Sequence, residues 1–221
     1  NGEYHIDGEK KLTERNATIV YSGGDDVFIV GAWNEVIELS IDLQEKFKKY
    51  TQGTLSISSG IGIYECTYPI GAIANETGEM EAESKRMPEK DSVTLMDDGE
   101  THLINELEIC DGTYRWEELY KSVLGEKYDV IQDFLGESDE RGMSFLYRML
   151  ELIRNQKEKI NFARFVYLLS RLEPDKEGEK KEKYRKFSRK MYQWVQSEKD
   201  CRELKTAINL YAYMHREKGA H

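Results

Sequence analysis

Residues 21–26 read YSGGDD, and this stretch decides how the first half of the chain folds. The residues on either side, 17–21 and 27–30, are β-branched and apolar, as buried strands are. The two adjacent glycines allow positive φ and a tight reversal of the chain. The stretch therefore predicts a β-hairpin that carries two aspartates at its tip.

These aspartates, Asp25 and Asp26, can be interpreted in two ways. Glycine and aspartate are common turn formers, so the stretch could be a solvated turn and nothing more. Two neighbouring carboxylates repel each other, however, and a turn needs only one of them. Their oxygens suit a hard divalent cation, and nucleoside triphosphates bind such cations. We therefore predict that both are metal ligands and catalytic residues at a nucleotide site.

The composition indicates a soluble chain. Its 221 residues carry a formal net charge of −10, and 33% of them are charged. No apolar run approaches the roughly 20 residues of a membrane span, and no signal peptide opens the sequence. Cys66, Cys110 and Cys201 match neither a disulfide framework nor a zinc motif, which favours a reducing cytoplasm and no membrane contact.

The charge is distributed unevenly along the chain. Residues 1–98 hold 19 acidic and 9 basic residues, whereas residues 99–221 hold 23 of each. We therefore expect two domains with these bounds. A basic run at 180–190 is interpreted mainly as a solvated helix face, with a surface facing RNA or a partner as the alternative.

The first domain has an α/β pattern. We expect an amphipathic helix over about residues 34–51, a strand over 55–63, one interrupted or two short helices over 69–86, and a strand over 93–96. This order is most of a ferredoxin-like palm, as found in many nucleotidyl transferases and cyclases, without its first strand and helix. Glycines at 60 and 62 in the expected strand indicate close approach of another backbone or of a ligand.

The second domain has a helical pattern. From about residue 103 onward, apolar side chains recur at helical spacing and predict a bundle of five or six helices. The aromatic residues in these stripes are most simply core. The expected fold class is thus α/β plus all-α: a partial, cyclase-like palm followed by a C-terminal helical bundle.

Several stretches together resemble one known family. They are YSGGDDVFIVGAW at 21–33, LSISSGIGIY at 55–64, TGEME at 77–81, NFAR at 161–164 and YLLSR at 167–171. In this order they resemble the large palm subunit of type III-A (Csm-type) CRISPR effector complexes. The resemblance covers its second palm domain and its C-terminal helical domain.

This resemblance implies a function in antiviral defence. The palm would use ATP with Mg²⁺ or Mn²⁺ to make cyclic oligoadenylate messengers when the complex, with its guide RNA, holds a matching target RNA. An HD-type single-stranded DNase domain and the first palm domain would belong to the remaining N-terminal part of the subunit, outside this chain. Other Csm-type subunits, including the small helical subunit, are the implied partners. The chain alone is expected to be inactive.

The predicted nucleotide site extends beyond the two aspartates. Gly23 and Gly24 allow phosphate or ribose to approach the backbone, and Ser22 can form a hydrogen bond with the nucleotide. Lys85 and Lys90 follow the last palm helix, where the related GGDEF cyclases carry an AKxxGRN-type pair that contacts phosphates. The spacing here departs from that pattern by one residue, so an ordinary exposed loop is the alternative for both lysines.

Two other functions are compatible with the sequence. A GGDEF-type diguanylate cyclase is one, but Asp26 and Val27 stand where that family has Glu and Phe, and the helical half is foreign to it. A catalytically silent structural or interaction fragment is the other, because the expected palm lacks its first strand and its partner palm.

Overall fold

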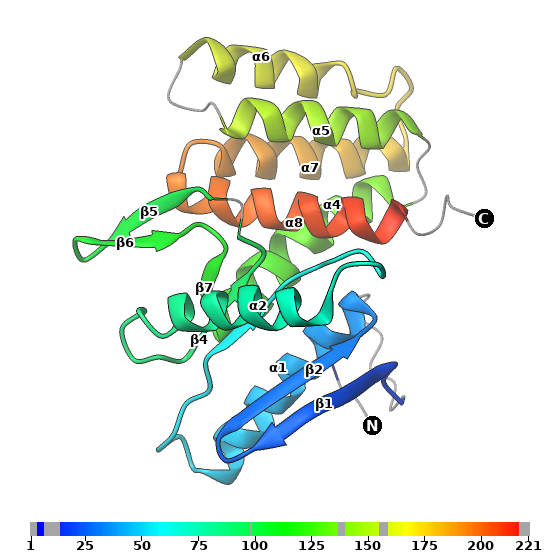
Figure 1. The fold of residues 1–221 in the computed structure, drawn as a ribbon. Coiled ribbons are helices and arrows are strands. Elements are labelled where there is room, and N and C mark those ends of the chain that lie inside the picture. The colour runs from blue at the N-terminus through cyan, green and yellow to red at the C-terminus, as the bar shows by residue number, and fades with distance from the viewer. Residues whose placement is uncertain (1–3, 7–13, 98, 137–139, 155–158, 217–221) are drawn as a thin grey trace. The chain divides into compact units, whose positions relative to one another are not determined.

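The computed structural model describes residues 4–6, 14–97, 99–136, 140–154 and 159–216. The chain divides into two compact units, residues 1–120 and residues 121–221 (Figure 1). Among the described residues, no helix is both long and apolar enough to cross a membrane.

The predicted hairpin is confirmed, but its strands are not buried as expected, because Ile19, Val20, Tyr21 and Val27 are more than half exposed. β1 (Ala17–Gly23) and β2 (Asp26–Gly31) pair antiparallel and are joined by a two-residue turn. Gly24, the first turn residue, has a φ of 64°, a left-handed value that a type II′ turn requires there and that glycine adopts without steric cost. Within the described part of the chain, these two strands form a sheet of their own.

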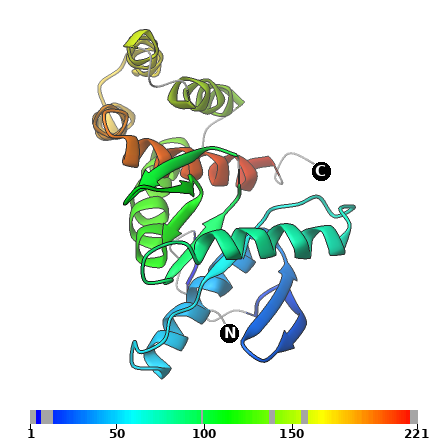
Figure 2. The ribbon, with the colours of Figure 1, turned by 60° about the vertical axis from the view of Figure 1, so that its left-hand side comes forward.

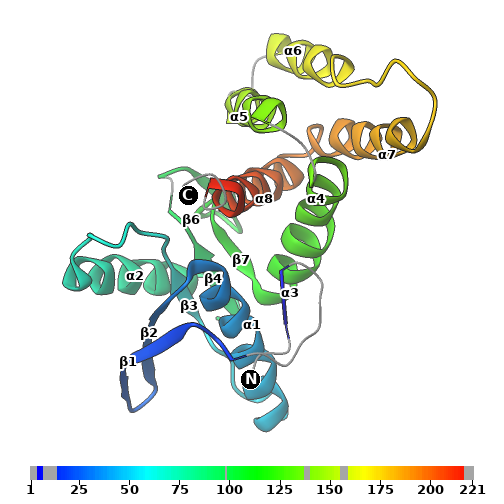
Figure 3. The same ribbon diagram turned by 90° about the vertical axis from the view of Figure 1, so that its right-hand side faces the viewer.

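The centre of the first unit is a three-stranded sheet with the helices α1 and α2, and the short helix α3 (Trp116–Glu118) ends the unit. α1 (Trp33–Tyr50) follows the hairpin, and β3 (Ser59–Ile61) runs parallel to β4 (Ser92–Leu95). α2 (Ile70–Ser84) joins these two strands and runs alongside them (Figure 3). β7 (Thr113–Arg115) pairs antiparallel with β4 and completes the sheet order β3–β4–β7.

α2 packs against β3 at a glycine, as the sequence indicated for this strand. A Cβ atom added at Gly60 would collide with the carbonyl oxygen of Thr77 and the amide nitrogen of Glu81, both in the backbone of α2. The close approach is therefore that of a helix and not of a ligand. Val93 and Leu95 of β4 are fully buried in the core of this unit.

The structure corrects several predicted elements of this unit. The expected strand over 55–63 is confined to β3, and α2 is one uninterrupted helix. The stretch after residue 100 is not helical, because β5 (Thr101–Ile104) and β6 (Leu107–Cys110) form a second antiparallel hairpin. Exposed and half-buried side chains alternate along β5, which is the two-residue period of a strand.

The division between the units differs from the predicted boundary after residue 98. β7 belongs to the sheet of the first unit, and Trp116 directly after it is buried there. The indole Nε1 of Trp116 donates a hydrogen bond of 2.8 Å to the carbonyl oxygen of Ile57. Residues 99–120 therefore complete the first unit instead of opening the helical domain.

The second unit is the predicted helical bundle. Its helical segments are η1 (Leu119–Tyr128), a π-helical stretch that continues into α4 (Asp129–Leu135), then α5 (Glu140–Arg154), α6 (Lys159–Ser170), α7 (Glu179–Trp194) and α8 (Glu198–Arg216). Figure 2 shows α5 and α6, in yellow-green and yellow, as neighbouring helices. The expected fold class, α/β plus all-α, is confirmed.

Lys127 is a buried cation inside this bundle, with only 2% of its surface exposed. Its Nζ lies 2.5 Å from Glu203 Oε2 and 2.7 Å from Asp200 Oδ1. Burial lowers the pKa of Lys127, but the hydrogen bonds to Asp200 and Glu203 outweigh burial and leave the pKa raised. The bundle thus contains an ion cluster in which Lys127 is the buried cation.

Candidate nucleotide site

The hairpin tip presents both predicted metal ligands to solvent. Asp25 is the second residue of the turn and Asp26 is the first residue of β2, and both side chains are exposed. Neither carboxylate forms an ion pair within the part of the chain that the structure describes. Two acceptor-only groups are therefore available side by side at one point.

Of the neighbouring residues of the tip, Ser22 and Gly24 are open and Gly23 is covered. Ser22 is exposed on β1, and Gly23 pairs with Asp26 across the turn. The ring of Tyr21 folds over Gly23, where a Cβ atom would lie 2.5 Å from the Tyr21 hydroxyl oxygen. The space above Gly24 is empty to at least 4 Å from an added Cβ atom, so a ligand can approach the backbone there.

Lys85 is a cation that responds to the charge of the two aspartates. It follows α2 directly, and its Nζ lies 2.5 Å from Glu81 Oε1. The hydrogen bond to Glu81 raises the pKa of Lys85, and the negative charges of Asp26 and Asp25 raise it further. The charges of Asp25 and Asp26 therefore act on the Lys85 ammonium, which directly follows the C-terminal end of α2.

Lys90 lies in the loop between α2 and β4, five residues after Lys85. Its side chain is exposed and forms no ion pair with the described residues. The loop is unusual, because Glu89 and Lys90 have φ values of 76° and 53° although neither is glycine. The charges of the aspartates thus act on Lys85, while Lys90 is an exposed cation on the loop that follows.

The two aspartates fit a magnesium-type site of the kind that a substrate completes. Among the described residues, no group of three or more His, Cys, Asp or Glu side chains could hold a metal ion by itself. Mg²⁺ demands less of the protein, because it keeps several waters and binds through one or two carboxylates plus substrate phosphates. Asp25 and Asp26 meet this requirement when a nucleotide supplies the remaining oxygens.

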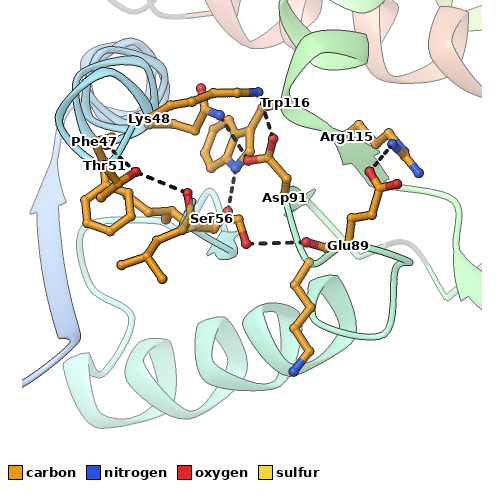
Figure 4. A network of polar contacts seen from close by, with 12 residues as sticks. Phe47, Lys48, Thr51, Ser56, Glu89, Asp91, Arg115 and Trp116 are labelled. Carbon is orange, nitrogen blue, oxygen red and sulfur yellow. Dashed lines mark hydrogen bonds and ion pairs between the residues drawn. The ribbon is translucent and has the colours of Figure 1, made fainter. Parts of the chain in front are cut away.

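Sequence reasoning missed two groups that hold this region. Glu81 is one, although its spacing of four residues from Lys85 on a helix is the signal for an ion pair. The other is a polar network around residues 86–91, in which Ser56 contacts Glu89 and Glu89 contacts Arg115 (Figure 4). No local pattern points to this network, because its partners are 26 or more residues apart.

A separate hollow of about 260 Å³ lies beside α1. Its lining residues are Gln44, Glu45, Lys48, Lys49, Glu117 and Tyr120. None of the predicted site residues lines it, and it carries charges of both signs. We therefore place the candidate site at the hairpin tip and not in this hollow.

Two family models match the chain. The second palm domain of Cas10/Cmr2 matches residues 3–94, and the second helical domain of the Cmr2 subunit of the CRISPR RNA silencing complex matches residues 132–217. The chain belongs to the Cas10/Cmr2 family. The two matched segments lie within the α/β unit and the helical unit, respectively, and they confirm the family that the sequence resembles.

Relatives of this family match over most of the chain. Each is named as the single-strand-specific deoxyribonuclease Cas10/Csm1 of a subtype III-A CRISPR system. The Mycobacterium tuberculosis protein is 40% identical over 96% of this chain and 25% of its own length. The Streptococcus thermophilus protein is 34% identical over 91% of this chain and 25% of its own length. The chain therefore spans about a quarter of the length of these relatives.

Two solved structures show the same fold. Csm1 of T. onnurineus aligns with a TM-score of 0.68 at 22% identity, over 90% of this chain and 28% of that one. A Csm1–Csm4 cassette, described as a complex with one ATP, aligns with a TM-score of 0.57 at 24% identity, over 88% and 27%. The partial palm followed by helices is thus an architecture that known Csm1 proteins contain.

Proposed function

We propose that this chain carries the nucleotide site at which a type III-A CRISPR effector subunit makes cyclic oligoadenylates from ATP. The observation that carries the proposal is the exposed pair Asp25 and Asp26 at the hairpin tip, whose charges act on the ammonium of Lys85. Such a pair offers acceptors for a divalent cation, and Lys85 offers a cation for the triphosphate. The ATP complex of the similar Csm1–Csm4 cassette supports the choice of nucleotide.

The residues divide the chemistry between them. A 3′-hydroxyl attacks the α-phosphate in line, the bond to the β-phosphate breaks, and pyrophosphate leaves. Asp25 and Asp26 would hold Mg²⁺ or Mn²⁺, which neutralises phosphate charge and lowers the pKa of the attacking hydroxyl when bound. Lys85 binds phosphate oxygens in exchange for Glu81, and Lys90 adds a second charge. Gly24 admits the nucleotide to the backbone, Gly23 would do so once the Tyr21 ring moves aside, and Ser22 donates a hydrogen bond to the nucleotide.

We propose further that the rest of the subunit completes this site and couples it to RNA. The remaining N-terminal part, with the HD and first palm domains, and the other Csm-type subunits would supply the missing ligands and the response to target RNA. The deoxyribonuclease activity in the relatives' names is assigned in this proposal to the HD domain, outside this chain. A cytoplasmic location, where ATP and crRNA-guided complexes meet, fits the proposal.

The decisive experiment removes both carboxylates in the full-length subunit. Asp25→Ala/Asp26→Ala is assembled with its partners and guide RNA and incubated with ATP, Mg²⁺ and target RNA. We expect cyclic oligoadenylate, measured by mass spectrometry, to fall at least about 100-fold while assembly and RNA binding persist. Glu79→Ala, an exposed acid on α2, is the matched control and should leave synthesis unchanged. Undiminished synthesis by the double variant would refute the proposal.

Two further measurements separate the alternatives. Incubation of the unmodified complex with GTP should yield little cyclic di-GMP, and a dominant cyclic di-GMP product would instead identify a diguanylate cyclase. The chain on its own should turn over little ATP, because we propose that its site is incomplete. Strong turnover by the isolated chain would show that no ligands from elsewhere are needed.

A further inference from the structure

The loop between α2 and β4 holds two adjacent residues in the left-handed region. Glu89 and Lys90 have φ values of 76° and 53°. Side chains other than glycine and asparagine adopt this conformation rarely, and it persists only where the surroundings fix it. Because glycine would relieve the strain, the presence of Glu and Lys at these positions indicates that their side chains have a use.

Two serine hydroxyls fix this conformation from the segment before β3. Ser58 Oγ donates a hydrogen bond of 2.5 Å to the carbonyl oxygen of Lys90. Ser56 Oγ donates one of 3.3 Å to the carbonyl oxygen of Glu89, and Figure 4 labels these two residues. The serine segment is itself held, since buried Trp116 donates from Nε1 to the carbonyl oxygen of Ile57 between the two serines. A rigid core side chain therefore positions the hydroxyls that hold the loop.

The residues on either side of Lys90 have partners of their own. Glu89 pairs with Arg115 at 2.7 Å, and the Asp91 carboxylate accepts from Gln44 at 3.0 Å and from Lys48 at 3.2 Å. The Lys90 ammonium, by contrast, forms no ion pair with any part of the chain that the structure describes. The loop is thus fastened at three consecutive residues, while one cation among them stays available.

We propose that Ser58, assisted by Ser56, is a positioning residue that holds Lys90 within reach of the triphosphate bound beside Lys85. The inference rests on the proposed nucleotide site and adds to it a group that acts on the backbone of the lysine and not on the ligand. Because the loop is already ordered before the nucleotide binds, binding costs less conformational entropy of the loop. The Ser58 hydroxyl thereby contributes to nucleotide affinity.

The test measures ATP affinity in the full-length subunit with Mg²⁺. Ser58→Ala and Lys90→Ala should each weaken ATP binding about three- to tenfold, as expected for one hydrogen bond or one exposed charge. The double variant should be no weaker than Lys90→Ala alone, because Ser58 acts through Lys90. Thr54→Ala is the matched control: its hydroxyl bonds Thr51 at 2.6 Å in the same segment and does not touch the loop.

Hydrogen exchange supplies a readout that needs no nucleotide. Ser58→Ala should speed amide exchange in residues 85–91, and Thr54→Ala should not. If Ser58→Ala fails to fold, Ser58→Cys replaces it, since a thiol keeps the volume but donates weakly. Unchanged ATP affinity in Ser58→Ala would overturn this inference and leave the proposed function standing. So would a double variant in which the affinity losses of Ser58→Ala and Lys90→Ala multiply. An unmodified subunit that binds no ATP would overturn the proposed function, and this inference with it.

Discussion

Charge decides how the residues at the hairpin tip can act. Asp25 and Asp26 are exposed and repel each other, and Lys85 is the described cation whose pKa responds to both. Glu81 holds Lys85 when no phosphate is present. Since the pKa of Lys85 is raised, its ammonium stays charged at every pH at which the synthesis of oligoadenylates from ATP would be assayed. Lys85 is therefore the residue at which we expect triphosphate binding to be most sensitive.

Replacing Lys85 by alanine in the assembled complex should raise the KM for ATP about tenfold, because one charge-assisted phosphate contact is lost. Lys85→Arg keeps the charge and should recover part of the affinity. Initial rates of oligoadenylate formation over a range of ATP concentrations measure both effects. Arg86→Ala, next in sequence but paired with Glu83, is the control and should behave as the unmodified protein. An unchanged KM in Lys85→Ala would remove this lysine from the site.

The cysteines differ in reactivity because they differ in burial. Burial raises the pKa of the Cys201 thiol to about 12, so at pH 8 only roughly one thiol in ten thousand is ionised. Cys66 is exposed. Iodoacetamide at pH 8 should therefore modify Cys66 and spare Cys201 in the folded protein, as read by peptide mapping. Denaturant should make both react, and equal labelling without denaturant would contradict the buried position of Cys201.

At the scale of elements, the contact of α2 with β3 governs the palm. Gly60→Ala forces a methyl group into the backbone of α2 and should destabilise the first unit by about 2 kcal/mol or more. Gly78→Ala on the exposed side of the same helix meets nothing within 4 Å and should stabilise it by about 0.5–1 kcal/mol. Urea unfolding measures both. Equal effects of the two substitutions would show that the close approach at β3 does not exist.

The elements also show how far sequence patterns reach. The first hairpin was predictable because its turn has glycine where φ is positive. The second was missed because its turn residues, Asn105 and Glu106, have φ values of 49° and 69° without any glycine. β3 is shorter than the stretch 55–63 over which apolar residues alternate. The segment before it is held by side-chain hydrogen bonds of Ser58 and Trp116 instead of by strand pairing. The apolar period of a sequence does not show whether side-chain hydrogen bonds will replace strand pairing in this way.

At the scale of the whole molecule, two compact units predict two separable unfolding events. Lys127→Ala leaves the buried Glu203 carboxylate without its closest cation and should cost the helical unit about 3–5 kcal/mol. Lys190→Ala removes a half-exposed pair with Glu126 and should cost less than about 1 kcal/mol. Calorimetry should show Lys127→Ala lowering one transition and Gly60→Ala the other. A single transition lowered by both would contradict two independent units.

The same lysine sets the alkaline limit of the helical unit. The pKa of Lys127 in the folded protein is raised above its ordinary value of 10.5. The folded state therefore holds the proton of Lys127 more tightly than the unfolded state does, and this difference stabilises the fold. This stability is fully present below pH 10.5 and is lost as the pH rises through the raised value. Denaturant titrations between pH 8 and pH 12 should show the loss in the unmodified chain. In Lys127→Met the alkaline loss should be smaller, and an identical pH profile would exclude the lysine as its cause.

The sequence by itself determined the hairpin and its two aspartates, the palm helices, the helical bundle and the family. These features depend on turn chemistry and on apolar periods, which act between residues close in the chain. Only the tertiary structure decided that the charges of Asp25 and Asp26 act on Lys85, and that Ser58 holds the loop of Lys90. These interactions join residues about 30 to 60 positions apart. They depend on tertiary packing, such as the close approach of α2 to β3 at Gly60, which no local pattern specifies.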